Sequence, residues 1–280
     1  VATVIACAVS APVLASESVH LDKFPTEKMQ SMPALQDGAR TFVNYCLNCH
    51  SASMMRFNRL QDIGLTDEQI SGSLQFTEGR VGDLMKVAMR HEDGKAWFGA
   101  APPDLSVEAR ARASESGSGA DWIYTYLRSY YRDGSRETGW NNAIFPNVGM
   151  PNPLWQWQGM RGAVEERVAP VTDEATGKVT GWTKTTITYD REGNKSEKVE
   201  KVSGDGLHEG THFTLGTPEG GTLSQAEFDD KVANLVAFMK FMSDPSASTR
   251  GRLGIWVLLF IALFVGCTWW LNREYWKDIK

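Results

Sequence analysis

The chain is poor in cysteine and has no excess of positive charge, and both features narrow the classes of protein it can belong to. Its 280 residues include 4 cysteines, 29 lysines and arginines, and 34 aspartates and glutamates, for a formal net charge of −5. An acidic chain is a poor ligand for nucleic acid, and any charged partner is expected to be basic. The mean hydropathy of −0.32 predicts that most of the chain is soluble.

The few cysteines are unevenly placed. Cys7 and Cys267 lie in apolar end segments, whereas Cys46 and Cys49 stand together in the run Cys-Leu-Asn-Cys-His that ends at His50. A zinc site would need a second Cys/His pair nearby, and a redox dithiol would need a βαβ context. C-x-x-C-H is typical of covalent haem c attachment, in which both thiols add to the porphyrin and the histidine ligates the iron. Zinc and dithiol chemistry remain the alternatives for this run.

The first fifteen residues are small and apolar, and polar residues follow directly. This pattern predicts that residues 1–15 are the end of a secretory signal peptide, with a short buried strand or helix as the alternative. Export agrees with haem c, because this cofactor is attached after translocation. Residues 16–248 are therefore interpreted as a periplasmic haem c domain.

A second apolar segment, Leu253–Leu271, carries no charged residue. Its length of about 19 residues is what a bilayer-spanning helix requires. Arginine and lysine flank both ends, and tryptophans gather at the C-terminal edge, where their rings favour the lipid interface. We predict a membrane anchor over residues 249–272 in the bacterial cytoplasmic membrane, followed by a cytoplasmic tail over 273–280.

The soluble part reads as mainly helical. Expected helices run over 35–51 into the cysteine motif, over 120–131 with Trp122, Tyr126 and Tyr130 four residues apart, and over 228–242 as an amphipathic helix. Residues 161–223 differ, because β-branched runs over 180–188 and 196–202 flank a turn and predict a hairpin. The predicted fold class is mainly α, with a β-hairpin insertion over 161–223 and one C-terminal transmembrane helix.

A low-spin haem c needs a second axial ligand, and methionine or histidine can supply it. Met150 lies between glycine and proline, which favour a loop that can present its sulfur. Met160 is the second candidate, whereas Met54 and Met55 are too close in sequence to reach the opposite ring face. The bis-histidine alternatives are His20, His91, His208 and His212.

Taken together, these motifs resemble the cytochrome c1 family, from about Lys23 to the C-terminus apart from 161–223. The resemblance rests on Tyr45–Ser51, on Gly99–Ser106 followed by Arg110-Ala111-Arg112, on the helix from Asp121, on Gly149-Met150-Pro151 and on the single anchor. The insertion departs from mitochondrial members and indicates a bacterial protein.

The resemblance implies a class I c-type cytochrome fold and a set of haem contacts. Met150 would be the sixth ligand opposite His50, and Arg112 would pair with a haem propionate. The remaining contacts implied by the family are Pro103, Leu105, Trp122 and Phe145. Trp122 stands where other members carry tyrosine.

The resemblance also implies a one-electron carrier within ubiquinol–cytochrome c reductase of a respiratory or photosynthetic chain, with no substrate chemistry of its own. Its haem would take electrons from the Rieske iron–sulfur protein and pass them to a cytochrome c, in a dimeric complex that includes cytochrome b. The alternative is a membrane-anchored c-type cytochrome that serves a terminal oxidase or dehydrogenase, against which the proline loop and Arg110-Ala111-Arg112 argue. A third class, a haem enzyme or gas sensor, would need an open or labile sixth position.

Overall fold

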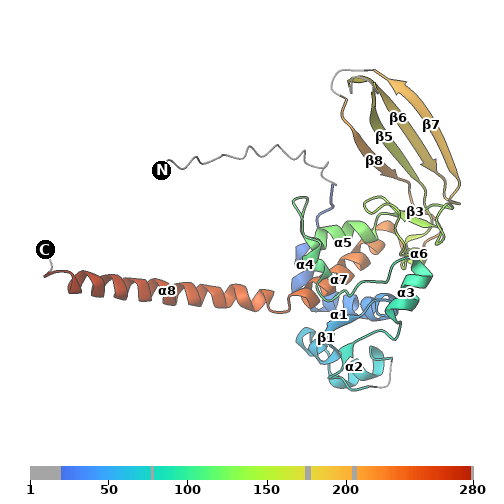
Figure 1. Cartoon of the computed structure of the whole chain (residues 1–280). Helices are drawn as coiled ribbons and strands as arrows, with labels where there is room; N and C mark the ends of the chain where they lie inside the picture. The colour runs from blue at the N-terminus through green and yellow to red at the C-terminus, as the bar shows by residue number, and fades with distance from the viewer. Residues whose placement is uncertain (1–19, 77–78, 174–177, 204–206, 279–280) are drawn as a thin grey trace. The chain divides into compact units, whose positions relative to one another are not determined.

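The structure is a computed structural model that describes residues 20–76, 79–173, 178–203 and 207–278 (Figure 1). The predicted signal peptide over 1–15, including Cys7, lies outside the described residues. Within the described part, backbone contacts divide the chain into two compact units. One unit comprises residues 20–24, 98–100 and 112–230, and the other comprises residues 25–97, 101–111 and 231–278.

Helices dominate the described chain, and their α-helical members are α1 (Met32–Thr41), α2 (Asp67–Ser73), α3 (His91–Phe98), α4 (Glu108–Ala111), α5 (Gly119–Leu127), α6 (Trp155–Gln158), α7 (Gln225–Ser243) and α8 (Ala247–Tyr275). Two 3₁₀ helices, Thr26–Gln30 and Phe57–Ile63, and a π-helical turn, Phe42–Cys46, accompany them. The strands are β1 (Ala52–Arg56), β2 (Leu84–Met85), β3 (Tyr130–Arg132), β4 (Trp140–Asn142), β5 (Ala163–Thr172), β6 (Val179–Tyr189), β7 (Lys195–Val202) and β8 (Gly210–Leu215). The predicted mainly helical class is confirmed.

Helix α1 begins earlier than predicted and ends earlier as well. The hydroxyl of Ser31 accepts a hydrogen bond from Ala34 N and caps the helix, so the chain is already helical at Met32. Gly38 lies inside the helix, where an added Cβ atom would collide with the carbonyl oxygen of Asn234. Glycine at this position therefore allows α1 to pack closely against α7.

Helix α7 was expected to be amphipathic, and this expectation is wrong. Apolar side chains are buried nearly all round it, and they include Phe228, Val232, Ala233, Leu235, Val236, Phe238, Met239, Phe241 and Met242. The polar Asn234 is also buried, and its amide donates to Asp37 in α1. A helix that is hydrophobic on all sides is a core helix.

Helix α5 was predicted to continue to Tyr131 but ends at Leu127. It starts with a capping box between Ser118 and Asp121. After the helix, Tyr130 and Tyr131 belong to β3, which pairs antiparallel with β4. Tertiary contacts explain this early end, because the Arg161 guanidinium donates to the backbone carbonyl oxygens of Arg128 and Tyr130.

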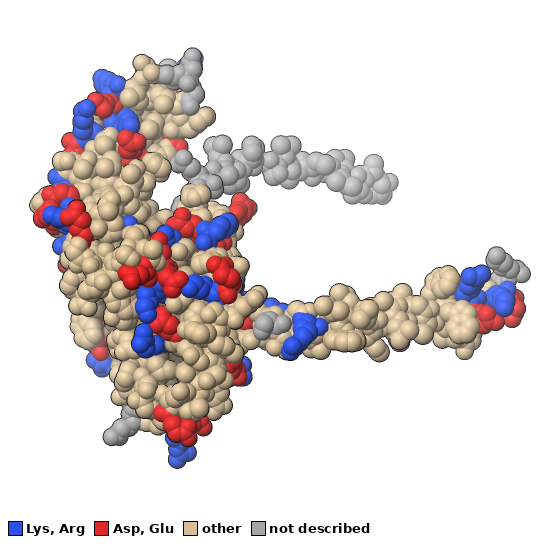
Figure 2. Space-filling view, turned by 180° about the vertical axis from the view of Figure 1, so that it is seen from behind, with Lys and Arg blue, Asp and Glu red and all other residues tan. Residues whose placement is uncertain are grey.

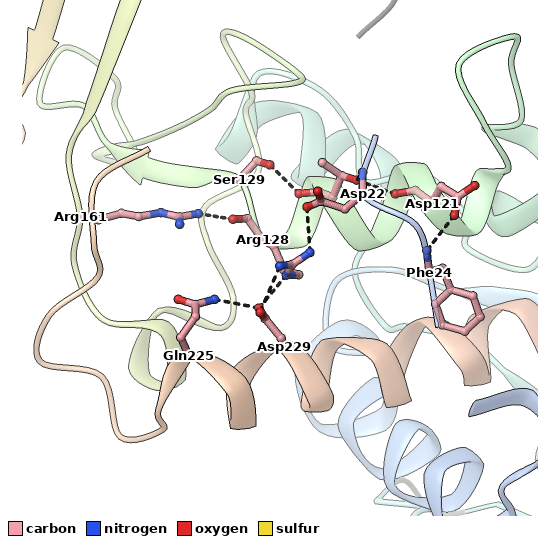
Figure 3. Close-up of polar contacts among 9 residues, drawn as sticks. Asp22, Phe24, Asp121, Arg128, Ser129, Arg161, Gln225 and Asp229 are labelled. Carbon is pink, nitrogen blue, oxygen red and sulfur yellow. Dashed lines mark hydrogen bonds and ion pairs between the residues drawn. The ribbon is translucent and has the colours of Figure 1, made fainter. Parts of the chain in front are cut away.

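Arg128 closes the end of α5 and fastens two distant segments to it (Figure 3). Its guanidinium bonds both carboxylate oxygens of Asp229 at 2.6 and 3.1 Å, and Asp22 at 2.9 Å. The same group lies 4.3 Å above the ring of Tyr124. A forked guanidinium–carboxylate pair of this kind combines charge with fixed geometry, so residues 20–24 and the start of α7 are held against α5.

The predicted hairpin is present but forms only half of a sheet. Strands β6 and β7 pair as expected, and β5 and β8 extend them to the order β7-β6-β5-β8 (Figure 1). Ala163, Ile187 and Tyr189 on one face pack with Tyr131 of β3. Because β5 and β8 lie far apart in the sequence, their pairing could not be read from local alternation.

Helix α8 is long and apolar enough to cross a membrane over Thr249–Tyr275, and this window is not buried in the protein. Figure 2 shows a long stretch of it without charged side chains. The exposed surface of this helix includes large apolar side chains such as Trp256, Phe260 and Leu263, and an apolar surface of this kind marks a site of contact with membrane or protein. Among the described residues this is the one helix that meets both conditions, and the predicted C-terminal transmembrane helix is confirmed in length and composition.

Candidate functional site

The cysteine motif lies on the tight turn that ends the π-helical segment after α1. Backbone hydrogen bonds from Cys49 N and His50 N both reach the carbonyl of Cys46, at 3.1 and 2.9 Å. Cys46 is buried, and burial together with the neighbouring Cys49 raises the pKa of its thiol to about 12. Burial also raises the pKa of the Cys49 thiol. Both thiols are therefore protonated at neutral pH.

This thiol chemistry does not suit the two alternative interpretations of the motif. A redox dithiol needs a lowered thiol pKa, because the thiolate is the nucleophile. A zinc centre needs further ligands, and no group of three or more His, Cys, Asp or Glu side chains suited to a metal is found in the described part of the chain. Covalent attachment as thioethers remains the chemistry that fits buried, uncharged sulfurs.

His50 is held in one tautomer. Its Nδ1 atom lies 2.8 Å from the carbonyl oxygen of Pro103. A carbonyl can only accept, so Nδ1 carries the proton and Nε2 keeps a free lone pair. Burial lowers the pKa of His50 despite the opposing effects of the Pro103 bond and of Glu108 and Asp104. A neutral imidazole with a free Nε2 is the form that ligates iron, so the motif fits haem c.

The loop that contains Pro103 is fastened to the segment after the motif. The amide of Leu105 donates to the carbonyl of Ser51 at 2.8 Å. The carboxylate of Asp104 accepts from the backbone and the hydroxyl of Ser53, at 2.8 and 2.6 Å. The structure thus brings Pro103 and Leu105 to the cysteine motif, as the resemblance implied. Sequence reasoning missed Asp104 and Ser53, whose types are common in turns.

A second cluster gathers predicted residues of the other unit. Trp122 and Tyr126 stack on α5 with ring centroids 4.9 Å apart, and Phe145 meets Trp122 edge-on at 6.3 Å. The Arg112 guanidinium carbon lies 4.5 Å from the centroid of the Trp122 ring and 6.0 Å from that of Phe145. Three of the predicted contacts therefore lie together, and tryptophan at position 122 serves as a platform for the cation.

Met150 belongs to the same cluster. The hydroxyl of Tyr126 donates to its sulfur over 3.6 Å, and its side chain packs near Tyr130. The preceding Gly149 comes so close to Phe98 that a Cβ atom would lie 2.6 Å from the Phe98 carbonyl oxygen. Close packing against Phe98 therefore requires glycine at position 149. From the sequence, this glycine was expected only to favour a loop.

The competing ligands have different surroundings. Met160 packs on the same aromatic cluster, and its backbone is paired with Glu219. The four other histidines, His20, His91, His208 and His212, are all exposed. These exposed histidines are poor candidates for the second ligand of a bis-histidine haem. Each side chain would have to become buried in order to bind the iron.

The cluster also contains Tyr126 and Tyr130, two members of the aromatic series that was predicted to lie on one helix. The hydroxyls of Tyr126 and Tyr130 lie 2.6 Å apart, although Tyr130 stands in β3 beyond the end of α5. Both tyrosines have a raised pKa, chiefly because of burial. The signal for them was the four-residue spacing from Trp122, which is more often a sign of helix packing.

The chain is similar to known proteins over most of its length. The sequence profile of the cytochrome c1 family matches residues 24–161. Cytochrome c1 of Allochromatium vinosum is 35% identical over 94% of this chain and 89% of its own length. The ammonia monooxygenase gamma subunit of Nitrosomonas europaea is 39% identical over 96% of this chain and 94% of its own length. Cytochrome c1 of Rhodospirillum rubrum is 24% identical over 89% and 82%.

A C-x-x-C-H turn with a free histidine nitrogen and a single apolar anchor define a membrane-anchored c-type cytochrome. The extent of the similarity goes further, and the chain belongs to the cytochrome c1 family. As a member it carries covalent haem c and is an electron-carrying subunit of a bc1 complex, beside cytochrome b and a Rieske protein. The predicted family and cofactor are confirmed.

Proposed function

We propose that this protein takes single electrons from the Rieske iron–sulfur protein and passes them to a cytochrome c. The observation that carries the proposal is the 2.8 Å contact between His50 Nδ1 and the Pro103 carbonyl, which leaves Nε2 for iron. A fixed ligand keeps the coordination the same in both oxidation states, which is what a carrier needs and an enzymatic haem does not.

Each proposed contact has a separate task. Haem c, when bound, supplies an iron that gains and loses one electron. Cys46 and Cys49 would tether it as thioethers, and His50 and Met150 would supply the nitrogen and the sulfur that ligate its iron. A thioether ligand favours the ferrous state and so raises the reduction potential. Arg112 would compensate a propionate charge, and Pro103, Leu105, Trp122 and Phe145 would contact the ring.

The ligand assignment is tested by comparing two methionine variants. Met150→Leu is expected to retain covalent haem but to lose the far-red band that marks methionine bound to ferric iron. The potential should fall by on the order of hundreds of millivolts, because leucine offers no sulfur. Met160→Leu is the matched control and should keep both properties. Loss of the band in Met160→Leu alone would show that Met160 is the ligand.

The proposed electron path is tested in the purified membrane complex. Quinol should reduce the haem of this subunit rapidly when the Rieske protein is present. A complex depleted of the Rieske protein should show no such phase, although dithionite still reduces the haem. Rapid reduction by quinol without the Rieske protein would overturn the path. Oxidation by an added basic cytochrome c, slowed by salt, tests the acceptor side.

We further propose that the haem domain faces the periplasm and the short tail the cytoplasm, within a dimeric complex. Export is required for covalent haem attachment, so the domain before α8 must be translocated. The net charge of −5 suits the docking of a basic acceptor. Cross-linking of the detergent-solubilised complex would reveal its subunit count, and a single copy of cytochrome b per particle would contradict the dimer.

The relative from Nitrosomonas europaea supports a second candidate partner. That protein is named as a subunit of ammonia monooxygenase, and it matches this chain over nearly its full length. Purification in mild detergent separates the two candidates. Cytochrome b and a Rieske protein in the purified particle support the bc1 assignment, whereas monooxygenase subunits in their place would support the second.

A further inference from the structure

Three side chains of one unit form a line of hydrogen bonds that ends on a methionine sulfur. The hydroxyl oxygens of Tyr126 and Tyr130 are 2.6 Å apart, and the Tyr126 oxygen is 3.6 Å from Met150 Sδ. Tyr130 is fully buried, and Tyr126 and Met150 are partly buried against it. A hydrogen bond in such surroundings is stronger than one in water.

The direction of donation follows from the chemistry of the three groups. A thioether has no hydrogen to give, so Tyr126 must be the donor to Met150. A phenol carries one proton, and Tyr126 has then used it. In the short contact between the two hydroxyls, Tyr130 is therefore the donor to Tyr126. The proton order is Tyr130 to Tyr126 to Met150.

Both tyrosines are held in place through their backbones and rings. The Tyr130 carbonyl accepts from Arg161 Nε at 2.8 Å and from Gln158 Nε2 at 3.2 Å. The Tyr126 carbonyl accepts from the Asn142 amide at 2.8 Å, and its ring stacks on Trp122. The Tyr126 hydroxyl is therefore held in position by the protein itself. Formation of its hydrogen bond to Met150 loses little conformational entropy as a result.

We propose that Tyr126 is a positioning residue that orients the Met150 sulfur by hydrogen bonding and raises the reduction potential of the haem. The inference rests on the proposed ligation by Met150. A thioether sulfur has two lone pairs, so one can face the iron while the other accepts from Tyr126. Donation to the second pair withdraws electron density from sulfur. A sulfur that donates less electron density to the iron destabilises the ferric state more than the ferrous state. The reduction potential therefore rises.

The test compares tyrosine variants of the full chain in its membrane complex. Tyr126→Phe keeps the ring on Trp122 and removes the donor. The reduction potential of its haem should fall. The fall should correspond to a several-fold change in the equilibrium constant for electron exchange with a reference redox couple. Its far-red band should persist at a shifted wavelength, because the sulfur stays bound. Tyr130→Phe should shift both in the same direction by less, since it removes only the group that orients Tyr126.

Two controls separate this inference from the ligand assignment. Tyr124→Phe removes a phenol hydroxyl from the same helix and should leave the potential and the band unchanged. Met150→Leu should abolish the band. If it does so while Tyr126→Phe and Tyr130→Phe keep the wild-type potential and band position, the hydrogen-bond role is wrong and the ligand is right. If the band survives in Met150→Leu, the ligand assignment and this inference both fail.

Discussion

The carboxylate of Asp104 accepts a hydrogen bond from the hydroxyl of Ser53 at 2.6 Å, and these residues are 51 positions apart. The same carboxylate accepts from the amides of Ser53 and Ser106, both at 2.8 Å. Burial alone would raise the pKa of Asp104, but these donors lower it on balance. The charged form thus holds the loop whose carbonyl at Pro103 orients His50.

Asp104→Asn should loosen this loop. An asparagine side chain replaces one carboxylate oxygen with an NH2 group, which cannot accept a hydrogen bond. At least one of the groups that donate to Asp104 would then lose its acceptor, and the free energy of unfolding should fall by about 1 kcal/mol. Thermal unfolding followed at the haem band measures it. Glu92→Gln changes an exposed carboxylate of α3 and should have no effect. Equal stability of both variants would show that the Asp104 network does not support the loop.

Gly149→Ala should disturb the methionine ligand through the backbone. The added Cβ would lie 2.6 Å from the carbonyl oxygen of Phe98, and a carbonyl cannot rotate away as a side chain can. We expect a loss of about 1–3 kcal/mol in stability and a weakened far-red band, because Met150 must shift with its neighbour. Gly72→Ala enters open space on α2 and is the control. An unchanged band in Gly149→Ala would contradict the tight approach.

Arg112→Gln should lower both stability and reduction potential. The guanidinium lies 4.5 Å from the centre of the Trp122 ring, and a cation in this position contributes about 0.5–1 kcal/mol. Removal of the positive charge that we propose to pair with a propionate also favours the ferric state, so the potential should fall. Redox titration and thermal unfolding measure the two effects. Arg110→Gln is the neighbouring control, and a larger effect there would transfer the propionate role to Arg110.

Stability should fall in acid because of Asp121. Its burial alone would raise its pKa, but hydrogen bonds from the amides of Phe24 and Ser118 and the nearby Lys23 lower it on balance. A lowered folded pKa means that the stabilisation is complete above the ordinary value of about 3.9 and is lost as pH falls through the folded value. Asp121→Asn should be less stable than the wild type by about 1–3 kcal/mol at neutral pH and by less at pH 3. The exposed Asp62→Asn is the control, and a constant difference between Asp121→Asn and wild type across this range would exclude the linkage.

A stop codon after residue 248 should release the haem domain from the membrane. Helix α8 is the candidate span, because within a bilayer every polar backbone group must be bonded inside the helix. The truncated protein should be soluble in the periplasm, keep its visible spectrum and exchange electrons with a soluble cytochrome c. It should no longer assemble with cytochrome b, because the missing helix supplies that contact. Recovery of the truncated protein in the membrane fraction would reveal a second attachment.

The features that the sequence determined by itself depend on neighbouring residues. The C-x-x-C-H run predicted haem c because the chemistry needs both thiols and the imidazole within one turn. The uncharged run from Leu253 predicted α8 because a helix that crosses a bilayer needs about that many consecutive apolar residues. The capping box of Thr66 and Gln69 at the start of α2 was also predictable, since both partners lie within three residues.

Tertiary structure decided the features whose partners are distant in the chain. Whether Tyr130 continues α5 or enters β3 depends on Arg161, which takes the carbonyl that a longer helix would have used. The sheet has four strands because β5 pairs with β8, and only a folded chain brings them together. The Tyr126 hydroxyl became a candidate donor to a ligand only because the chain folds back and brings Met150, 24 positions away, into contact with it. A hydrogen bond requires such contact, and sequence spacing alone cannot show it.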